Sequence, residues 1–247
     1  MRTAVAALLA ILVDGCGNID APAAKLQSLK TVGIISAIGD ELTLTQAGLT
    51  GFADNEQRFS IESWGVDDLI VTRVSALLAP RFQVQPVSYP RAVFAARQRD
   101  APIAAMNLLR DDPIKEFVRT QVSPPGVDAY IVITKATSKY GSRGRTVAGI
   151  GIVNRGAVFG SYVQLHALYV ITMIDGHELK AIGKRTAPPL GNDDIVKLPG
   201  PSRQVDASLL PTATNVPASN EALKAAVIDL IERSLPATLQ DLRLVDR

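Results

Sequence analysis

The side chains of this sequence that could support covalent or metal chemistry are few and widely spaced. Histidine occurs at His166 and His177, and cysteine occurs once, at Cys16. A zinc site needs three or four such ligands close together, and a thiol nucleophile needs a basic partner such as histidine. His177 stands beside a predicted turn, and His166 is expected to pack within a sheet. We therefore expect no metal, no cofactor and no assigned catalytic residue.

The acidic residues include four adjacent pairs, which are Asp40-Glu41, Asp67-Asp68, Asp111-Asp112 and Asp193-Asp194. Neighbouring carboxylates on a helix point to different faces, so they do not converge as a general acid and base would. Two of the pairs stand at predicted helix starts, where negative charge favours the positive end of the helix dipole. These pairs are expected to be structural.

A glycine-rich connection between two predicted strands concentrates positive charge. Lys139, Arg143 and Arg145 stand close to Tyr140, and Lys135 precedes them. Such a loop can bind an anion through arginine side chains and exposed backbone amides. Lys139, Tyr140, Arg143 and Arg145 are therefore the binding candidates, and a solvated hairpin tip is the alternative.

The segment 149–154 begins like a dinucleotide-binding fingerprint, with Gly149 and Gly151, but has Asn154 where the third glycine belongs. More strand follows it instead of a phosphate-binding helix, which indicates that these glycines serve close packing or a bulge. The sole tryptophan, Trp64, is expected in the core.

The amino terminus has the pattern of an export signal. Arg2 is followed by an apolar run to Val13, which is too short to span a bilayer. The next residues, 14–18, contain Cys16 and resemble the lipobox of bacterial lipoproteins, in which the cysteine takes a diacylglycerol and becomes the new amino terminus. Asp14 departs from that motif, which normally has a small uncharged residue there. The resemblance implies a signal peptide over 1–15 and lipid attachment at Cys16.

Two other interpretations of the amino terminus stay open. Ala21-Pro22-Ala23 is an A-x-A site, at which ordinary signal peptidase would release a soluble periplasmic protein. The other is an uncleaved helix with an incidental cysteine.

Composition limits the class of protein. Of the 247 residues, 47% are hydrophobic, and Lys plus Arg exceeds Asp plus Glu by 26 to 24. A net charge of +2 gives no general attraction to a polyanion, so no nucleic-acid partner is expected. Disordered, collagen-like and disulfide-scaffold proteins are excluded by the apolar content and the single cysteine.

The periodicity of apolar residues predicts alternating strands and helices. Strands are expected at 31–38, 41–45, 58–62, 82–87, 129–133, 147–153, 157–174 and 178–182. Gly39-Asp40 predicts a hairpin between the first two strands, Gly160-Ser161 a bend in the long one, and Asp175-Gly176 a hairpin after it. The uniformly apolar run 129–133 is expected at the centre of the sheet.

Helices are expected from Ser63 as N-cap to Pro80, over 102–110, from Pro113, and from Ser219 or Asn220 to Pro236, with a short piece beyond. The segment 186–220 contains six prolines and is expected to be a functional or disordered loop. The prediction is one α/β (α+β) domain over 31–247, a mixed β-sheet with antiparallel hairpins and helices packed on its faces, preceded by a tether over 16–30.

With its lipobox-like start, this order resembles small envelope lipoproteins of the curli-secretion, TolB amino-terminal and penicillin-binding-protein-activator kind. The resemblance rests on 31–38, the helix 64–78 and 129–133. It is also similar to proteobacterial proteins whose helix begins Trp-Gly-Val-Asp-Asp, here Trp64 to Asp68. No functional residue carries over.

The sequence therefore predicts a non-enzymatic lipoprotein of the bacterial cell envelope, facing the periplasm and anchored through an amino-terminal lipid. Its partner would be an envelope protein or a cell-wall component, bound at a sheet edge, at the 139–145 loop or at 186–220. The alternatives are an envelope hydrolase acting on a glycan or phosphoester, and a periplasmic protein that binds a small anion. Two carboxylates about 5 to 9.5 Å apart in one cleft would favour a glycosidase.

Overall fold

The computed structural model describes residues 18–47, 55–100, 113–123, 126–140, 145–157, 160–190, 198–212 and 216–246. Cys16, the predicted signal peptide and the predicted helix 102–110 lie outside these ranges. Within them, no helix is both long and apolar enough to cross a membrane.

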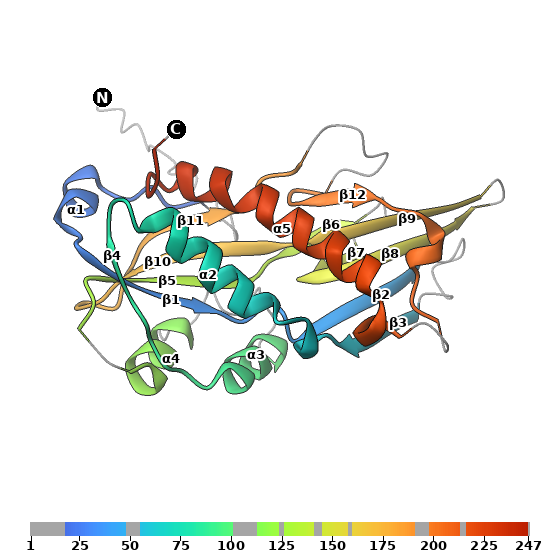
Figure 1. The fold of residues 1–247 in the computed structure, drawn as a ribbon, viewed down its shortest axis with the longest axis horizontal. Coiled ribbons are helices and arrows are strands. Elements are labelled where there is room, and N and C mark those ends of the chain that lie inside the picture. Colours follow the sequence, from blue (N-terminus) through green and yellow to red (C-terminus); the bar gives the residue numbers. More distant parts are fainter. Residues whose placement is uncertain are drawn as a thin grey trace, which may run out of the picture.

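Most of the strands form two five-stranded sheets that lie end to end along the long axis of the molecule (Figure 1). In spatial order, sheet A consists of β11 (Ala181–Thr186), β10 (Tyr169–Asp175), β5 (Ala129–Lys135), β1 (Thr31–Ser36) and β4 (Gln83–Gln85). Sheet B consists of β12 (Ser202–Gln204), β9 (Gly160–Ala167), β8 (Ile150–Ala157), β2 (Glu41–Ala47) and β3 (Asn55–Ser60). A separate hairpin pairs β6 (Thr137–Tyr140) with β7 (Arg145–Ala148).

Both sheets are mixed, which confirms the predicted fold class. β1 pairs in parallel with β4 and β5, and β2 pairs in parallel with β8, whereas the other neighbours are antiparallel. β5 is the central strand of sheet A and is buried at every position, as its unbroken apolar run predicts. The predicted hairpin at Asp175-Gly176 joins β10 to β11.

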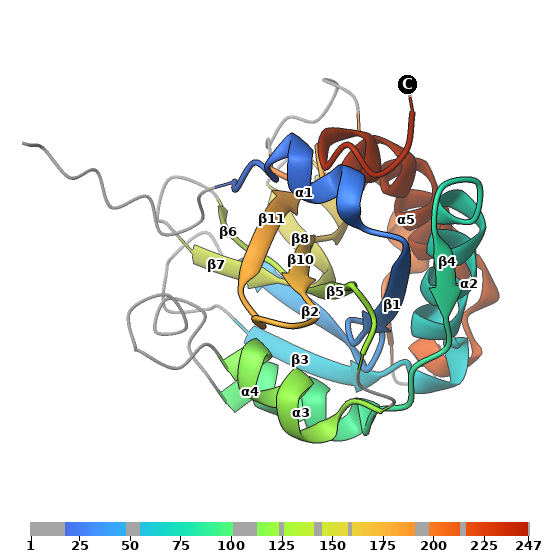
Figure 2. The same cartoon turned by 90° about the vertical axis from the view of Figure 1, so that its left-hand side faces the viewer.

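Helices cover the sheets unequally. α2 (Val66–Leu78) and α5 (Glu221–Asp241) pack on one face of both sheets, in a core that includes Ile34 and Ile131 of sheet A and Leu42 of sheet B. α3 (Arg91–Asp100) and α4 (Pro113–Gln121) cover the other face of sheet A (Figure 2). The second face of sheet B has no helix among the described residues; the β6–β7 hairpin packs there.

The first two strands are not a hairpin, so that prediction is wrong. β1 ends in sheet A and β2 begins in sheet B, so the chain passes from one sheet to the other. Gly39 lacks the positive φ that a two-residue hairpin turn needs. A glycine is required there for close approach instead, because a Cβ would lie 2.8 Å from Cβ of Val66 in α2.

One carboxylate, that of Asp67, fixes this crossing. It lies 5% exposed in the first turn of α2 and accepts hydrogen bonds from Ser36 Oγ (2.7 Å), Ile38 N (2.9 Å) and Gly39 N (3.1 Å). The two backbone N–H groups at the crossing have no strand partner, so the carboxylate satisfies them. The acidic start of α2 therefore joins the helix to the end of β1 and to the connection that leads to sheet B, in addition to favouring the helix dipole.

A second crossing occurs between β9 and β10. The single strand predicted over 157–174 is wrong, because β9 ends at Ala167 in sheet B and β10 begins at Tyr169 in sheet A, so the chain changes sheets at Leu168. Leu168 N donates to Gly149 O, and Leu168 O accepts from Ala136 N, so the crossing stays hydrogen-bonded.

The segment expected as a tether is largely folded from Asn18 onward. α1 spans Ala23–Ser28, and its Leu26 is buried in the main core. Ile19 forms a β-bridge with Lys184 of β11. The segment is folded because its apolar residues Ala21, Leu26 and Leu29 are buried in the main core.

Two helix boundaries differ from the predictions. Ser63 lies inside a short 3-10 helix, η1 (Glu62–Trp64), and α2 begins after Gly65, whose φ of 64° lets the chain turn. α5 begins after Asn220 as predicted, with Asn220 Oδ1 accepting from Leu223 N, but it continues through Pro236. The hydroxyl of Tyr169 contacts Ser234 (2.7 Å) and Thr238 (3.4 Å), which holds the helix on both sides of that proline.

The proline-rich segment is ordered wherever the structure describes it. It contributes β12 to the edge of sheet B, followed by the short 3-10 helices η3 (Ala207–Leu209) and η4 (Pro217–Ser219). Pro217 O accepts from the indole nitrogen of Trp64 at 3.1 Å, and Trp64 is buried as predicted. The described parts of the segment expected to be a functional or disordered loop thus include a strand and two short helices.

We predict that Asp67→Ala lowers the free energy of unfolding by about 3 kcal/mol, because it leaves buried hydrogen-bond donors without the charged acceptor that they have in the wild type. The neighbouring Asp68→Ala is the matched control. Asp68 is 73% exposed and pairs with Arg91, so its loss costs about 1 kcal/mol or less. Urea unfolding of the purified chain measures both, and equal losses would contradict the role assigned to Asp67.

Candidate functional site

The two chain crossings place charged side chains at the junction of the sheets. Asp40 and Glu41 follow the first crossing directly, and Lys135 ends β5 beside them. Lys135 is 8% exposed. Its ammonium lies 2.7 Å from Asp40 Oδ1 and 3.0 Å from Glu41 Oε1. A buried ammonium is costly unless it is paired, and these two carboxylates are the partners of Lys135.

Helix α3 contributes two further polar residues. Gln98 is buried, and its amide donates to Ala37 O (2.8 Å) and accepts from Lys135 N (2.9 Å), so it links the ends of β1 and β5. Arg99 lies 3.9 Å from Asp40 and 3.6 Å from Glu41. These distances exceed direct hydrogen bonds, so the two contacts do not saturate the guanidinium donors of Arg99.

His166 forms part of the floor of the site, in β9. It is buried, and its Nδ1 lies 2.9 Å from Gly149 O. A carbonyl only accepts, so Nδ1 carries the proton and Nε2 keeps its lone pair. Burial lowers the pKa of His166 to about 4, so the ring is neutral at pH 7. The position of His166 within the sheet confirms the sequence prediction.

Both glycines of the fingerprint-like segment are needed for close packing, as expected. Gly149 has a φ of 56°, and a Cβ there would lie 3.1 Å from the Lys135 side chain. A Cβ on Gly151 would lie 2.7 Å from the His166 ring. The glycines thus make room for the two residues that define the site.

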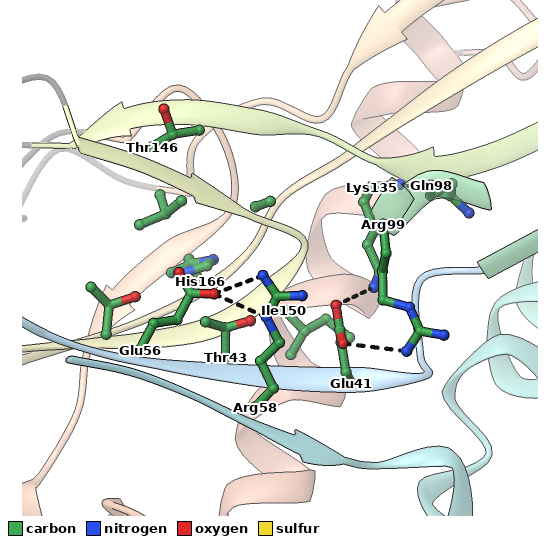
Figure 3. A pocket seen from close by; sticks show the side chains of 13 residues that line it. Glu41, Thr43, Glu56, Arg58, Gln98, Arg99, Lys135, Thr146, Ile150 and His166 are labelled. Carbon is green, nitrogen blue, oxygen red and sulfur yellow. Dashed lines mark hydrogen bonds and ion pairs between the residues drawn. The ribbon is translucent and has the colours of Figure 1, made fainter. Parts of the chain in front are cut away.

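A cavity of about 240 Å³ opens among these groups, and we call it the junction pocket (Figure 3). Its lining consists of Glu41, Thr43, Thr45, Glu56, Arg58, Gln98, Arg99, Lys135, Thr146, Val147, Ala148, Ile150 and His166. In Figure 3, dashed lines join Glu41 to Lys135 and to Arg99, and the Glu56–Arg58 pair of β3 lies on the other side of Glu41. The strand alternation of β2 explains the arrangement, because Thr43 and Thr45 point to the pocket while Leu42 and Leu44 point to the core.

The junction pocket combines both signs of charge with hydroxyl groups. Glu41 is held by two cations, and Glu56 lies 2.9 Å from Nε of Arg58. The arrangement can bind a polar, charged molecule. The described residues include no group of three or more metal-binding side chains.

The predicted anion-binding loop is a hairpin that covers the second face of sheet B. Lys139 is exposed, whereas Tyr140 is buried against Val147 and Val153. Arg145 pairs with Tyr140 in the hairpin, and Arg143 lies outside the described residues. Of the basic residues noted around this loop, Lys135 is the one that the structure places in the junction pocket.

Sequence reasoning did not identify most of the pocket. Gln98 and Arg99 belong to a helix that the sequence analysis did not predict, and the threonines of β2 face the pocket through a sheet change that it missed. The recognisable signal was the Asp40-Glu41 pair directly after a glycine, at the end of an apolar strand.

Comparison with known proteins adds little to this description. No family model matches the chain, and no curated protein matches it. Among solved structures, the lipoprotein GNA1162 from Neisseria meningitidis is similar over 83% of this chain and 99% of that one, with 13% identity and a TM-score of 0.27. One structural neighbour is thus a lipoprotein, but a TM-score this low carries no argument about function.

The buried His166 predicts how stability depends on pH. Its pKa is about 4 when folded and about 6.5 when unfolded, so protons bind the unfolded chain preferentially as pH falls through this window. Relative to His166→Gln, the wild-type protein should lose about 2 kcal/mol of unfolding free energy between pH 7 and pH 5.

Urea unfolding at the two pH values measures this difference. The exposed His177 supplies the control, because His177→Gln should retain the wild-type loss. If His166→Gln and the wild type lose stability equally, His166 is not buried as a neutral ring.

Proposed function

We propose that this protein is a non-enzymatic lipoprotein of the bacterial cell envelope that binds a cell-wall component in the junction pocket. The observation that carries the binding role is the pocket itself, in which Arg99, Lys135 and Glu41 converge beside threonine hydroxyls. The lipid anchor rests on the apolar run ending at Val13 and on Cys16 after it.

The folded start of the chain favours lipid attachment over release at Ala21-Pro22-Ala23. Ile19 exchanges two backbone hydrogen bonds with Lys184, at 3.0 and 2.9 Å. Arg185 binds Ile19 O and pairs with Asp20. Cleavage after Ala23 would remove these contacts, whereas cleavage before Cys16 retains them. The lipobox-like cut therefore fits the fold better.

Anchoring at residue 16 would also orient the molecule. Asn18 is the first described residue, and Ile19 joins the β11 edge near α1 and the C-terminal end of α5 (Figure 1). Sheet B, which includes β3, occupies the opposite half of the long axis (Figure 1). A lipid on Cys16 places the α1 end next to the membrane and sheet B toward the cell wall.

The lining of the junction pocket indicates the class of ligand. Cations at Arg58 and Arg99 suit a carboxylate, the carboxylates suit an ammonium group, and the threonines suit hydroxyls. A volume of 240 Å³ is below the range of about 300–1,000 Å³ that encloses a drug-sized ligand. It suits one sugar or amino-acid unit of a larger polymer, such as the glycan or stem peptide of peptidoglycan.

Cys16→Ser tests the anchor. We expect this variant to leave the membrane fraction and to lose labelling by a radioactive fatty acid, because the acylated thiol is absent. Membrane fractionation and autoradiography of cells expressing the wild type and the variant measure both. A variant that fractionates and labels like the wild type would refute lipid attachment at this residue.

Arg99→Ala tests the pocket. We expect the wild-type protein to sediment with purified peptidoglycan sacculi and Arg99→Ala to bind about tenfold more weakly, because a charge-assisted hydrogen bond to the ligand is lost. Arg73→Ala is the matched control, since Arg73 also makes an exposed ion pair, with Glu232 on α5, away from the pocket. Co-sedimentation over a range of sacculus concentrations gives the affinities.

Two results would contradict the binding proposal. Failure of the wild-type protein to sediment with sacculi would exclude this ligand class. Equal binding by the wild type and Arg99→Ala would place the binding site elsewhere on the protein.

A further inference from the structure

The outer edge of β3 differs from the other sheet edges of the described residues. β4 and β12 have three residues each, and the β11 edge is occupied by Ile19. β3 has six residues, of which all but Phe59 are exposed. It forms the lower margin of sheet B beyond α3 in Figure 1.

β3 lacks three of the usual devices that protect an edge strand, which are proline, lysine and a β-bulge. Its sequence, Asn-Glu-Gln-Arg-Phe-Ser, has no proline and no lysine. Its pairing with β2 runs through six consecutive residue pairs without a bulge, from Glu41↔Ser60 to Gln46↔Asn55. Its backbone is therefore regular enough for another strand to continue the sheet.

The charges of β3 select one way of pairing. In an antiparallel pair, two residues that lie opposite each other have the same backbone orientation, either toward the partner strand or away from it. This orientation alternates along a strand, so in two identical strands the opposed residues are an even number of positions apart. The symmetry axis therefore passes through one residue, which lies opposite its own copy. An axis at Glu56 or at Arg58 sets like charges opposite each other. An axis at Gln57 sets Glu56 opposite Arg58 of the second copy, twice.

The two charged side chains also lie on the same face of the sheet. Glu56 and Arg58 both line the junction pocket, whereas Phe59 packs against the main core. Within one chain they pair with each other at 2.8 Å, and they are 46% and 57% exposed. Opposite charges directly across an antiparallel pair attract, so both can turn to the second copy.

We propose that two copies of this chain form a symmetric dimer through antiparallel pairing of β3 with β3, centred on Gln57. The two B sheets become one continuous ten-stranded sheet. Each copy then contributes a charged residue beside the junction pocket of the other, so the two pockets lie next to each other. This inference goes beyond the proposed function and does not depend on the ligand.

Charge reversal tests the dimer. Full-length chains with two different affinity tags are co-expressed, and capture of one by the other is measured after detergent extraction. We expect wild type to capture wild type. Glu56→Arg alone and Arg58→Glu alone should each self-capture about tenfold less, because two like-charge contacts replace two attractive ones.

Mixing the two variants gives the decisive result. Glu56→Arg has only positive charges at these positions and Arg58→Glu only negative ones, so the pair is complementary and mutual capture should return. Pairing between two copies of the same variant cannot explain the recovery, because the charges at positions 56 and 58 have the same sign in each variant. Arg73→Glu reverses an exposed charge away from β3 and should self-capture like the wild type.

A crosslink tests the position of the axis. In the Cys16→Ser chain, Gln57→Cys should form a disulfide-linked dimer under mild oxidation, because residues on the axis are directly opposed within disulfide range. Gln85→Cys, on the β4 edge, is the control and should remain monomeric. The proposal fails if wild type does not capture itself, if the mixed variants do not recover, or if the two cysteine variants crosslink equally.

Discussion

The hydrogen bonds of the Asp67 carboxylate fix the segment through which the chain passes from sheet A to sheet B. One buried side chain at the start of α2 accepts from Ser36, Ile38 and Gly39, where β1 leaves sheet A. Without an acceptor at this point, two backbone N–H groups would be buried without hydrogen-bond partners, which would destabilise this path of the chain. This contact therefore attaches α2 to the connection between the two sheets.

The junction pocket is a consequence of that crossing. Because β2 continues beyond β1, Asp40 and Glu41 lie beside the end of β5, where they neutralise Lys135. Gln98 of α3 then bridges Ala37 and Lys135, which follow the last residues that pair β1 with β5. Among the described residues, a two-stranded hairpin covers the second face of sheet B, and a polar cavity lies beneath it. The same residues that join the sheets thus form the site.

Local patterns predicted the elements better than their arrangement. The run 129–133 predicted the central strand, and Pro113 and Asn220 predicted two helix starts. Asp175-Gly176 predicted a hairpin. These predictions were correct because each feature depends mainly on residues that are close together in the sequence. Gly39-Asp40 was misleading, because a glycine followed by an aspartate is compatible both with a hairpin turn and with a close approach to a helix. The contact with Asp67, which lies 28 positions later than Gly39 in the sequence, favours the close approach. Likewise, Lys135 stands out as a basic residue, but its carboxylate partners lie 94 and 95 positions earlier in the chain.

Hydrogen exchange with and without a peptidoglycan disaccharide-tetrapeptide tests most directly whether the junction between the sheets is a binding site. Bound ligand should slow exchange of backbone amides in β2 and in the β6–β7 hairpin, which form the floor and the roof of the pocket, and leave α5 unchanged. Slowed exchange confined to other elements, or no change at any amide, would contradict the account.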